Sequence, residues 1–198
     1  TVDRFLEARV DRETFTISYG GEPTEVRRYP ISIEWPPAAL ATQAPVAEAR
    51  RAVRERLGRA PEVCLGVGVD RLDYTKGILE RFMAVERLLE LEPRWVGKLT
   101  FVQAAAPSRS SIDEYQNFEA RVREFAARVN QRFGSAGYQP IVLRIEHHDA
   151  AQVYEMYRAA DFCFVSSLHD GMNLVAKEFV AAREDERGVL ILSQFTGA

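Results

Sequence analysis

Predominantly apolar runs recur along most of this chain. They span residues 63–69, 99–102, 141–145, 160–165 and 189–192. Runs without polar alternation are typical of strands that are buried on both faces, as in a parallel sheet. We therefore predict a strand at each of these positions.

The segments before and between these runs indicate helices, mostly by apolar residues at helical spacing. They are residues 46–57, 78–91, 110–133, 150–159 and 173–183. Strands that alternate with helices imply right-handed βαβ units. The pattern thus predicts an α/β fold with a doubly wound, Rossmann-like parallel sheet.

The first part of the chain follows a different pattern. Residues 14–19 alternate polar and apolar side chains, and residues 25–33 hold further apolar positions after a diglycine. This predicts two strands joined by a turn. Residues 35–37, Trp-Pro-Pro, are typical of a linker. We expect residues 1–37 to form a separate small part, and residues 38–198 the main domain, truncated at its carboxyl terminus.

The charge balance argues against some classes of function. The 198 residues include 26 basic and 29 acidic side chains, for a formal net charge of −3. Proteins that bind nucleic acids or anionic membranes depend on a large positive field, so we expect neither as a partner. No apolar run reaches the roughly 18 residues of a membrane span.

The cysteines and the first residues bear on the location of the protein. Cys64 and Cys163 lie inside predicted strands, remote from any Cys-x-x-Cys pair. We expect both to be buried free thiols in a reducing compartment, which favours the cytoplasm. The chain starts with neither a signal peptide nor an initiator methionine, so we expect a fragment of a longer protein.

Two polar turns follow the first and fourth strands of the alternating region. In doubly wound sheets, ligands bind at the carboxyl ends of the strands, where the strand order switches. In the commonest order, the first and fourth strands are neighbours at that point. We therefore expect the turns after residues 63–69 and 160–165 to meet at one crevice.

The first turn carries two cations. Arg71 offers a planar fork for paired phosphate oxygens, and Lys76 a mobile point charge. Together they could hold a diphosphate without a metal. The alternative is a pair of solvated loop cations that are bridged to Asp70 and Asp73.

The second turn precedes a predicted helix. Gly171 permits a tight backbone, and Asn173 is placed to cap the helix. Asp170 could bind sugar hydroxyls, or could instead be a capping carboxylate. Glu178 could accept hydrogen bonds from a ribose, or could instead be a buried structural acid.

Other candidates carry weaker signals. Arg109 follows another strand and either reaches the crevice or lies on the surface. His147 and His148 are adjacent and lack further ligands at a familiar spacing, so we expect no metal site. The Gly66-x-Gly68 pair lacks the third glycine of the dinucleotide fingerprint, and we expect these glycines to ease strand packing.

The two turns resemble motifs of a known family. The segments are Arg71-Leu72-Asp73-Tyr74-Thr75-Lys76-Gly77 and Asp170-Gly171-Met172-Asn173-Leu174-Val175-Ala176-Lys177-Glu178. They are similar to motifs of the trehalose-6-phosphate synthase family, retaining glycosyltransferases of family 20 with two Rossmann domains (the GT-B type). Residues 29–33, 107–109 and 179–182 agree with it too.

The resemblance implies a specific reaction. Glucose would pass from UDP-glucose, or another nucleoside diphosphate glucose, to glucose 6-phosphate with retention, giving trehalose 6-phosphate. It implies no cofactor and no metal, and a homo-oligomer is conceivable for the full-length enzyme. The present chain would be the C-terminal, donor-binding half with the last strands of the N-terminal domain. We expect it to bind the donor weakly and to have little or no activity alone.

The resemblance also implies roles for individual residues. Arg71 and Lys76 would hold the donor diphosphate, and Asp170 the donor glucose. Glu178 would meet the ribose, and Arg109 the acceptor phosphate. The other donor contacts would come from His148, beside the base, and from Leu174, Val175, Ala176 and Lys177.

Three alternatives compete with this interpretation. Glucosylglycerol-phosphate synthases and pseudo-glycosyltransferases share this half, and acceptor choice lies mainly in the other half. A non-catalytic sugar-nucleotide-binding module is a second alternative, although the intact Arg71, Lys76, Asp170 and Glu178 argue against decay. An NAD-type oxidoreductase is disfavoured by the incomplete glycine fingerprint.

Overall fold

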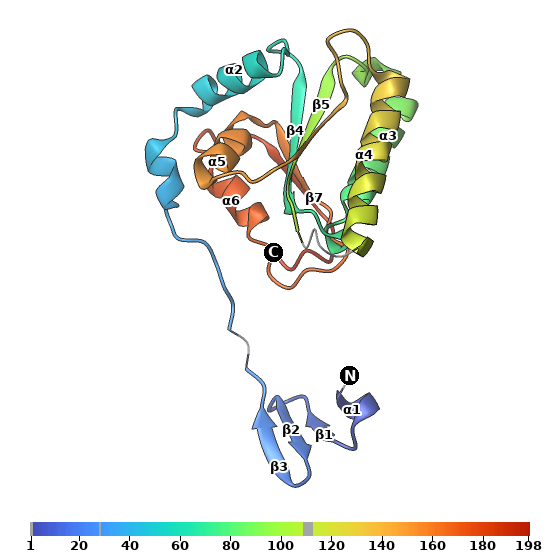
Figure 1. Cartoon of the computed structure of the whole chain (residues 1–198). Helices are drawn as coiled ribbons and strands as arrows, with labels where there is room; N and C mark the ends of the chain where they lie inside the picture. Colours follow the sequence, from blue (N-terminus) through green and yellow to red (C-terminus); the bar gives the residue numbers. More distant parts are fainter. Residues whose placement is uncertain (1, 28, 109–112) are drawn as a thin grey trace. The chain divides into compact units, whose positions relative to one another are not determined.

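The computed structural model describes residues 2–27, 29–108 and 113–198. These residues fall into two compact units, one that ends at Ile31 and one that begins at Ser32 (Figure 1). The domain boundary at residue 37 stays a prediction.

The first unit is a small antiparallel sheet. Its elements are α1 (Val2–Phe5), β1 (Arg9–Asp11), β2 (Thr16–Tyr19) and β3 (Glu22–Glu25). The prediction of a second strand within residues 25–33 was wrong, because β3 ends at Glu25. Gly20 and Gly21 have φ angles of 59° and 89°. Such a two-residue turn pairs Tyr19 directly with Glu22, so the second strand starts at once.

The second unit contains the predicted parallel sheet. Its strands are β4 (Cys64–Arg71), β5 (Leu99–Ala106), β6 (Ile141–Ile145), β7 (Phe162–Val165) and β8 (Val189–Leu192). Among the described residues they pair in the order β6-β5-β4-β7-β8, and every pair is parallel. The doubly wound α/β fold is thereby confirmed, and β4 and β7 are neighbours.

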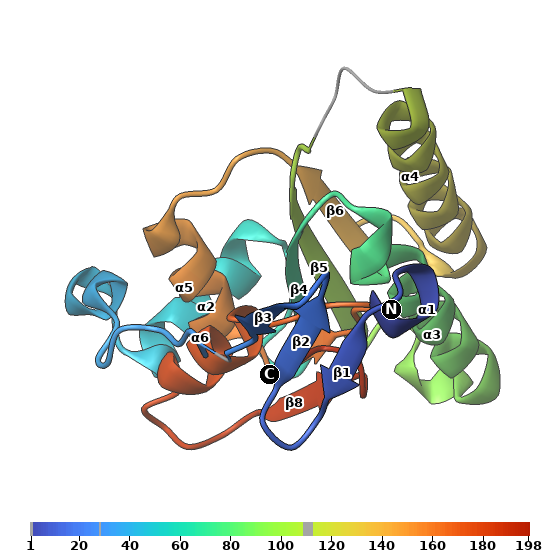
Figure 2. The same cartoon turned by 90° about the horizontal axis from the view of Figure 1, so that it is seen from below.

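Helices cover both faces of this sheet (Figures 1 and 2). They are α2 (Val46–Arg56), α3 (Ile78–Leu91), α4 (Asp113–Phe133), α5 (Ala150–Ala159) and α6 (Val175–Ala181). α3 and α4 lie on one face, and α2, α5 and α6 lie on the other. α6 is shorter than the predicted 173–183. Short 3-10 turns, which the pattern did not predict, span Ala38–Thr42, Tyr74–Lys76 and Pro93–Trp95.

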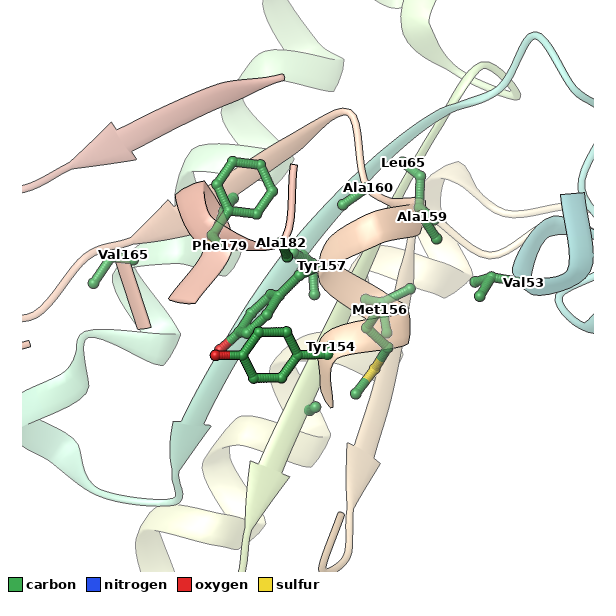
Figure 3. Close-up of a cluster of buried hydrophobic side chains, with 14 of the residues drawn as sticks. Val53, Leu65, Tyr154, Met156, Tyr157, Ala159, Ala160, Val165, Phe179 and Ala182 are labelled. Carbon is green, nitrogen blue, oxygen red and sulfur yellow. The ribbon is translucent and has the colours of Figure 1, made fainter. Parts of the chain in front are cut away.

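A hydrophobic cluster fills the space between the sheet and each helical layer. On the α5 side, Tyr157 is fully buried and packs its ring edge-on against Tyr154 and Phe179 (Figure 3). On the other side, Phe82 and Phe101 are fully buried in the centre. Burying one large apolar side chain contributes about 1.5–3 kcal/mol. These clusters hold the strand ends, and therefore the turns that follow them, in place.

The glycines of β4 ease packing, as predicted. A Cβ atom on Gly66 would lie 2.2 Å from the Phe162 ring, and one on Gly68 would lie 2.2 Å from the Arg81 guanidinium. Only glycine fits such close approaches. Gly66 and Gly68 therefore allow close packing of side chains against β4.

Both cysteines are free thiols. Cys163 is buried, and burial raises the pKa of its thiol to about 12. Cys64 is only half-buried, so the expectation of burial was wrong for this residue. None of the described helices combines the length and the apolar character that a membrane crossing requires.

Candidate functional site

A cavity of about 450 Å³ opens where β4, β5 and β7 end. Ligand sites in proteins commonly occupy about 300–1,000 Å³. Its lining residues come from the strand ends and from both polar turns: Val69, Asp70, Arg71, Lys76, Ala104, Ala106, His148, Val153, Asp170, Met172, Asn173, Leu174 and Val175. The predicted meeting of the two turns is thus observed among the described residues.

Other hollows fit a ligand less well. A cavity of about 140 Å³ between the sheet, α2 and α5 is too small for a sugar nucleotide. A wider hollow of about 970 Å³ lies at the opposite edge of the sheet. Its buried Arg54 already donates to Asp161, together with Arg50. The carboxyl edge, where ligands of doubly wound folds bind, is also where both polar turns line a cavity.

The first turn is shaped by its own carboxylate. Asp73 accepts hydrogen bonds from the backbone N–H and the hydroxyl of Thr75, at 2.9 and 2.8 Å. These bonds start the 3-10 turn that carries Lys76. Gly77 then takes a left-handed φ of 65°, and α3 begins. Arg71, the last residue of β4, is exposed at the rim.

Direct bonds join the two turns. The carbonyl of Thr75 accepts a hydrogen bond from the N–H of Leu168 at 2.8 Å. The Lys76 ammonium lies 2.7 Å from the Asp170 carboxylate, with only 15% and 16% of the two side chains exposed. A pair so shielded is more than a solvated surface contact. Lys76 therefore pairs with Asp170. The alternative, in which Lys76 is a solvated loop cation bridged to Asp70 or Asp73, is not observed.

The electrostatics of Asp170 reflect this pairing. Partial burial raises the pKa of Asp170, but hydrogen bonds from Lys76 and Asn173 outweigh it and hold the pKa below its ordinary value. The carboxylate also accepts the N–H of Gly171 at 3.0 Å. Asp170 is thus ionised and fixed in place at neutral pH.

Asn173, and not Asp170, provides a side-chain acceptor for the first turn of α6, although the N-cap position itself is Leu174. The Asn173 side-chain oxygen accepts the N–H of Ala176 at 3.0 Å. Asn173 thus bonds to a first-turn N–H as predicted, but from the position before the N-cap, and the capping alternative for Asp170 is not observed. Because Asn173 and Leu174 lie before the first helical turn, α6 starts later than the pattern indicated.

Glu178 lies outside the lining of the cavity. Its carboxylate accepts a hydrogen bond from the Tyr157 hydroxyl at 3.0 Å. Burial raises the pKa of the Tyr157 hydroxyl well above its usual range, and the negative charge of Glu178 adds to this effect. Ala176 is buried and Lys177 is half-buried, and neither lines the cavity. The proximity of these three residues to a donor stays a prediction.

His148 forms part of the cavity wall, with 8% of its side chain exposed. Its Nε2 atom has no hydrogen-bond partner among the described residues. The carboxylate of Glu146 lies 3.5 Å away, within ion-pair range but too far for a good hydrogen bond. A buried polar atom without a partner is unusual. The Nε2 atom of His148, unpartnered within the described part of the chain, is therefore consistent with a ligand group that binds in the cavity beside it.

Arg109, the residue predicted to bind the acceptor phosphate, lies outside the described residues, so its placement is not described. Ala104 and Ala106 also line the cavity, at the end of β5, and were not predicted as site residues. Their small side chains leave room for a ligand, but small size alone does not mark a site in a sequence. No group of three or more His, Cys, Asp or Glu within the described parts of the chain is placed to hold a metal ion.

The comparison with known families agrees with this geometry. The family model of glycosyltransferase family 20 matches residues 1–198. The chain belongs to glycosyltransferase family 20. The resemblance of the two motifs to this family is thereby confirmed.

Relatives within family 20 are similar over most of the chain. The alpha,alpha-trehalose-phosphate synthase (UDP-forming) of Schizosaccharomyces pombe is 41% identical over 182 residues, 92% of this chain. The alignment covers 35% of that relative, so the chain spans about a third of its length.

Solved structures of family 20 share the fold. A UDP-forming alpha,alpha-trehalose-phosphate synthase from Burkholderia xenovorans, in complex with glucose 6-phosphate, superposes with a TM-score of 0.85 at 33% identity. It covers 100% of this chain and 44% of that one. The E. coli protein bound with UDP-2-fluoro glucose gives a TM-score of 0.85 at 33% identity, over 99% of this chain and 43% of that one.

Proposed function

We propose that this chain is the donor-binding half of a retaining glucosyltransferase that forms trehalose 6-phosphate. The donor is UDP-glucose or another nucleoside diphosphate glucose, and the acceptor is glucose 6-phosphate. The single observation that carries this proposal is the Lys76–Asp170 pair, which places a cation and a carboxylate side by side in the cavity. The names of the family 20 relatives and the sugars in their structures support it.

The pair suits a sugar diphosphate for a simple reason. A lysine ammonium carries three N–H donors. One donor serves Asp170, so the others are available for phosphate oxygens. Arg71 at the rim adds a fork for the same diphosphate. Asp170, held beside them, would accept hydrogen bonds from the hydroxyls of the donor glucose.

The proposed reaction needs no covalent bond to the enzyme. The bond between the anomeric carbon and the diphosphate breaks, and the acceptor oxygen bonds to that carbon on the same face. The proton of the acceptor hydroxyl passes to an oxygen of the leaving diphosphate. Lys76 and Arg71 stabilise the negative charge that develops on this diphosphate, which is electrostatic preorganisation.

The remaining site roles belong to the same proposal. His148 would contact the base, and the backbone around Leu174 and Val175 would face the donor. Arg109 would bind the acceptor phosphate. We also propose that transfer is metal-independent, that the protein works in the cytoplasm, and that the full-length enzyme forms a homo-oligomer.

Calorimetric titration tests the donor half directly. The 198-residue chain is titrated with UDP-, GDP- and ADP-glucose in the presence of EDTA. We expect measurable binding of at least one of them, because Arg71 and Lys76 are proposed to hold the diphosphate without a metal. Product analysis with glucose 6-phosphate should reveal little or no trehalose 6-phosphate. Size-exclusion chromatography and localisation of the natural-length protein test the last two proposals.

Distinct results would contradict distinct parts of the proposal. Absence of binding to every nucleoside diphosphate glucose would reject donor binding and leave a non-binding family 20 module. Turnover by this chain alone at the rate of a complete synthase would reject the view that it is only half of the enzyme. Binding that disappears in EDTA would reject metal independence.

Exchanging Glu178 for glutamine tests the ribose contact. The amide keeps the hydrogen bond from the Tyr157 hydroxyl but loses the negative charge. If Glu178 accepts bonds from the ribose hydroxyls, Glu178→Gln should lower donor affinity about tenfold, as for a charged hydrogen bond. Tyr157→Phe is the matched control, because it removes the hydroxyl and leaves the carboxylate. Equal donor affinity of Glu178→Gln and wild type would mean that Glu178 is only a structural acid.

A further inference from the structure

The largest fully buried side chain of the described residues is a cation beneath the cavity. Arg81, on α3, is 0% exposed, and its partner Asp70 is 3% exposed. The Arg81 Nη1 atom donates to Asp70 at 2.7 Å and to the Gln103 side chain at 2.6 Å. Burial raises the pKa of Asp70, an effect that the charge of Arg81 opposes. The result is a polar network below the end of β4.

The same guanidinium reaches both turns of the site. Its Nη2 atom donates to the backbone carbonyl of Lys76 at 3.4 Å. Its Nε atom donates to the hydroxyl of Ser166, directly after β7, at 3.1 Å. The Ser166 hydroxyl in turn donates to the carbonyl of Gly77 at 2.7 Å. Arg81 therefore bonds to the segment that carries Lys76 and to the segment that leads to Asp170.

The sheet is built around this side chain. A Cβ atom on Gly68 would lie 2.2 Å from Arg81 Nη1 and 2.6 Å from the Gln103 side-chain oxygen. The missing side chain of Gly68 thus provides the space that the guanidinium occupies. Removing an ion from water costs several kcal/mol unless its bonds are satisfied. Such a group is poorly suited to stability alone, which makes a role in positioning reasonable.

We propose that Arg81 is a positioning residue for the donor site, which holds Lys76 and Asp170 at their working distance through the Lys76 carbonyl and Ser166. This inference rests on the proposed function. Arginine is required because its planar fork directs five N–H donors to fixed points. Lysine would keep the charge for Asp70 but could not reach Ser166 and the Lys76 carbonyl together.

The test compares two buried arginines in the protein at its natural length. Arg81→Lys is expected to raise the donor KM about 10- to 100-fold, since bonds of a charged group to both turns are lost. The acceptor KM should stay unchanged. Arg54→Lys is the matched control: Arg54 is also buried beside a carboxylate, Asp161, but at the opposite edge of the sheet. Arg54→Lys should change only the melting temperature.

A double-mutant cycle separates positioning from general stability. If Arg81 acts partly through Lys76, adding Arg81→Lys to Lys76→Met should lower kcat/KM for the donor less than Arg81→Lys lowers it in the wild type, with only the effect on Asp170 remaining. Independent, multiplying effects would overturn the proposal. So would an Arg81→Lys donor KM equal to that of wild type.

Ser166→Ala keeps the proposal testable if Arg81→Lys does not fold. It removes one neutral partner of Arg81 and should raise the donor KM about fivefold. An unchanged KM would overturn the proposal. Wild-type protein that uses no nucleoside diphosphate glucose would overturn the proposed function itself, and this inference with it.

Discussion

Lys76→Met is expected to lower the affinity for the nucleoside diphosphate glucose about 100-fold, the upper range for loss of a charged hydrogen bond. Two effects act in the same direction. The donor diphosphate loses a cation, and the Asp170 carboxylate, now without its partner at 2.7 Å, repels the phosphates. Calorimetry with the best donor measures the change.

The control for this substitution is Lys98→Met. Lys98 is exposed just before β5, at the edge of the sheet opposite the cavity. The two variants lose the same charge, so a long-range effect of net charge would weaken both equally. Wild-type affinity in Lys76→Met would disprove the proposed role of this lysine in holding the diphosphate.

Gly77→Ala is expected to destabilise the fold by about 3 kcal/mol, the sum of a left-handed backbone penalty and a steric clash. Gly77 has a φ of 65°, and a Cβ atom there would lie 2.2 Å from the backbone carbonyl oxygen of Ser166. A backbone atom cannot move aside as a flexible side chain can. The two turns would therefore separate, and donor binding should weaken together with stability.

Gly58→Ala isolates the backbone part of this effect. Gly58 has a φ of 62°, and nothing lies within 4 Å of its would-be Cβ atom. Its replacement should cost only about 1 kcal/mol, the left-handed penalty alone. Urea unfolding at equilibrium measures both free energies. Equal losses at the two sites would show that the contact between Gly77 and Ser166 does not constrain the turns.

Both predictions depend on the contact between two segments that are far apart in the sequence. Lys76 and Asp170, for example, are separated by 94 positions. Sequence spacing placed each turn after a strand, and the strand order brought the turns together. The partner of Lys76 was not predictable in this way. Its ammonium had Asp70 and Asp73 nearby in sequence, yet Asp70 pairs with the buried Arg81 and Asp73 shapes the 3-10 turn.

Local pattern was a good guide where burial alone decides the structure. The bounds of α3, α5 and β6 agree with the apolar periodicity, because apolar side chains of those elements pack into a core. The bounds of β8 agree as well, although three of its four side chains are exposed. It was a poor guide at residues 25–33, where the two-residue turn sets the register of β3. It also gave no signal that Gly68 accommodates a guanidinium.

The amino-acid sequence by itself determined the alternation of strands and helices, the doubly wound sheet, and the two charged turns that identify family 20. These features follow from the spacing of apolar residues and from short motifs, which are local properties. Only the tertiary structure decided that Lys76 pairs with Asp170, that Glu178 bonds to Tyr157, and that Arg81 connects both turns from below. These contacts depend on which side chains share a buried space, and packing in three dimensions sets that choice.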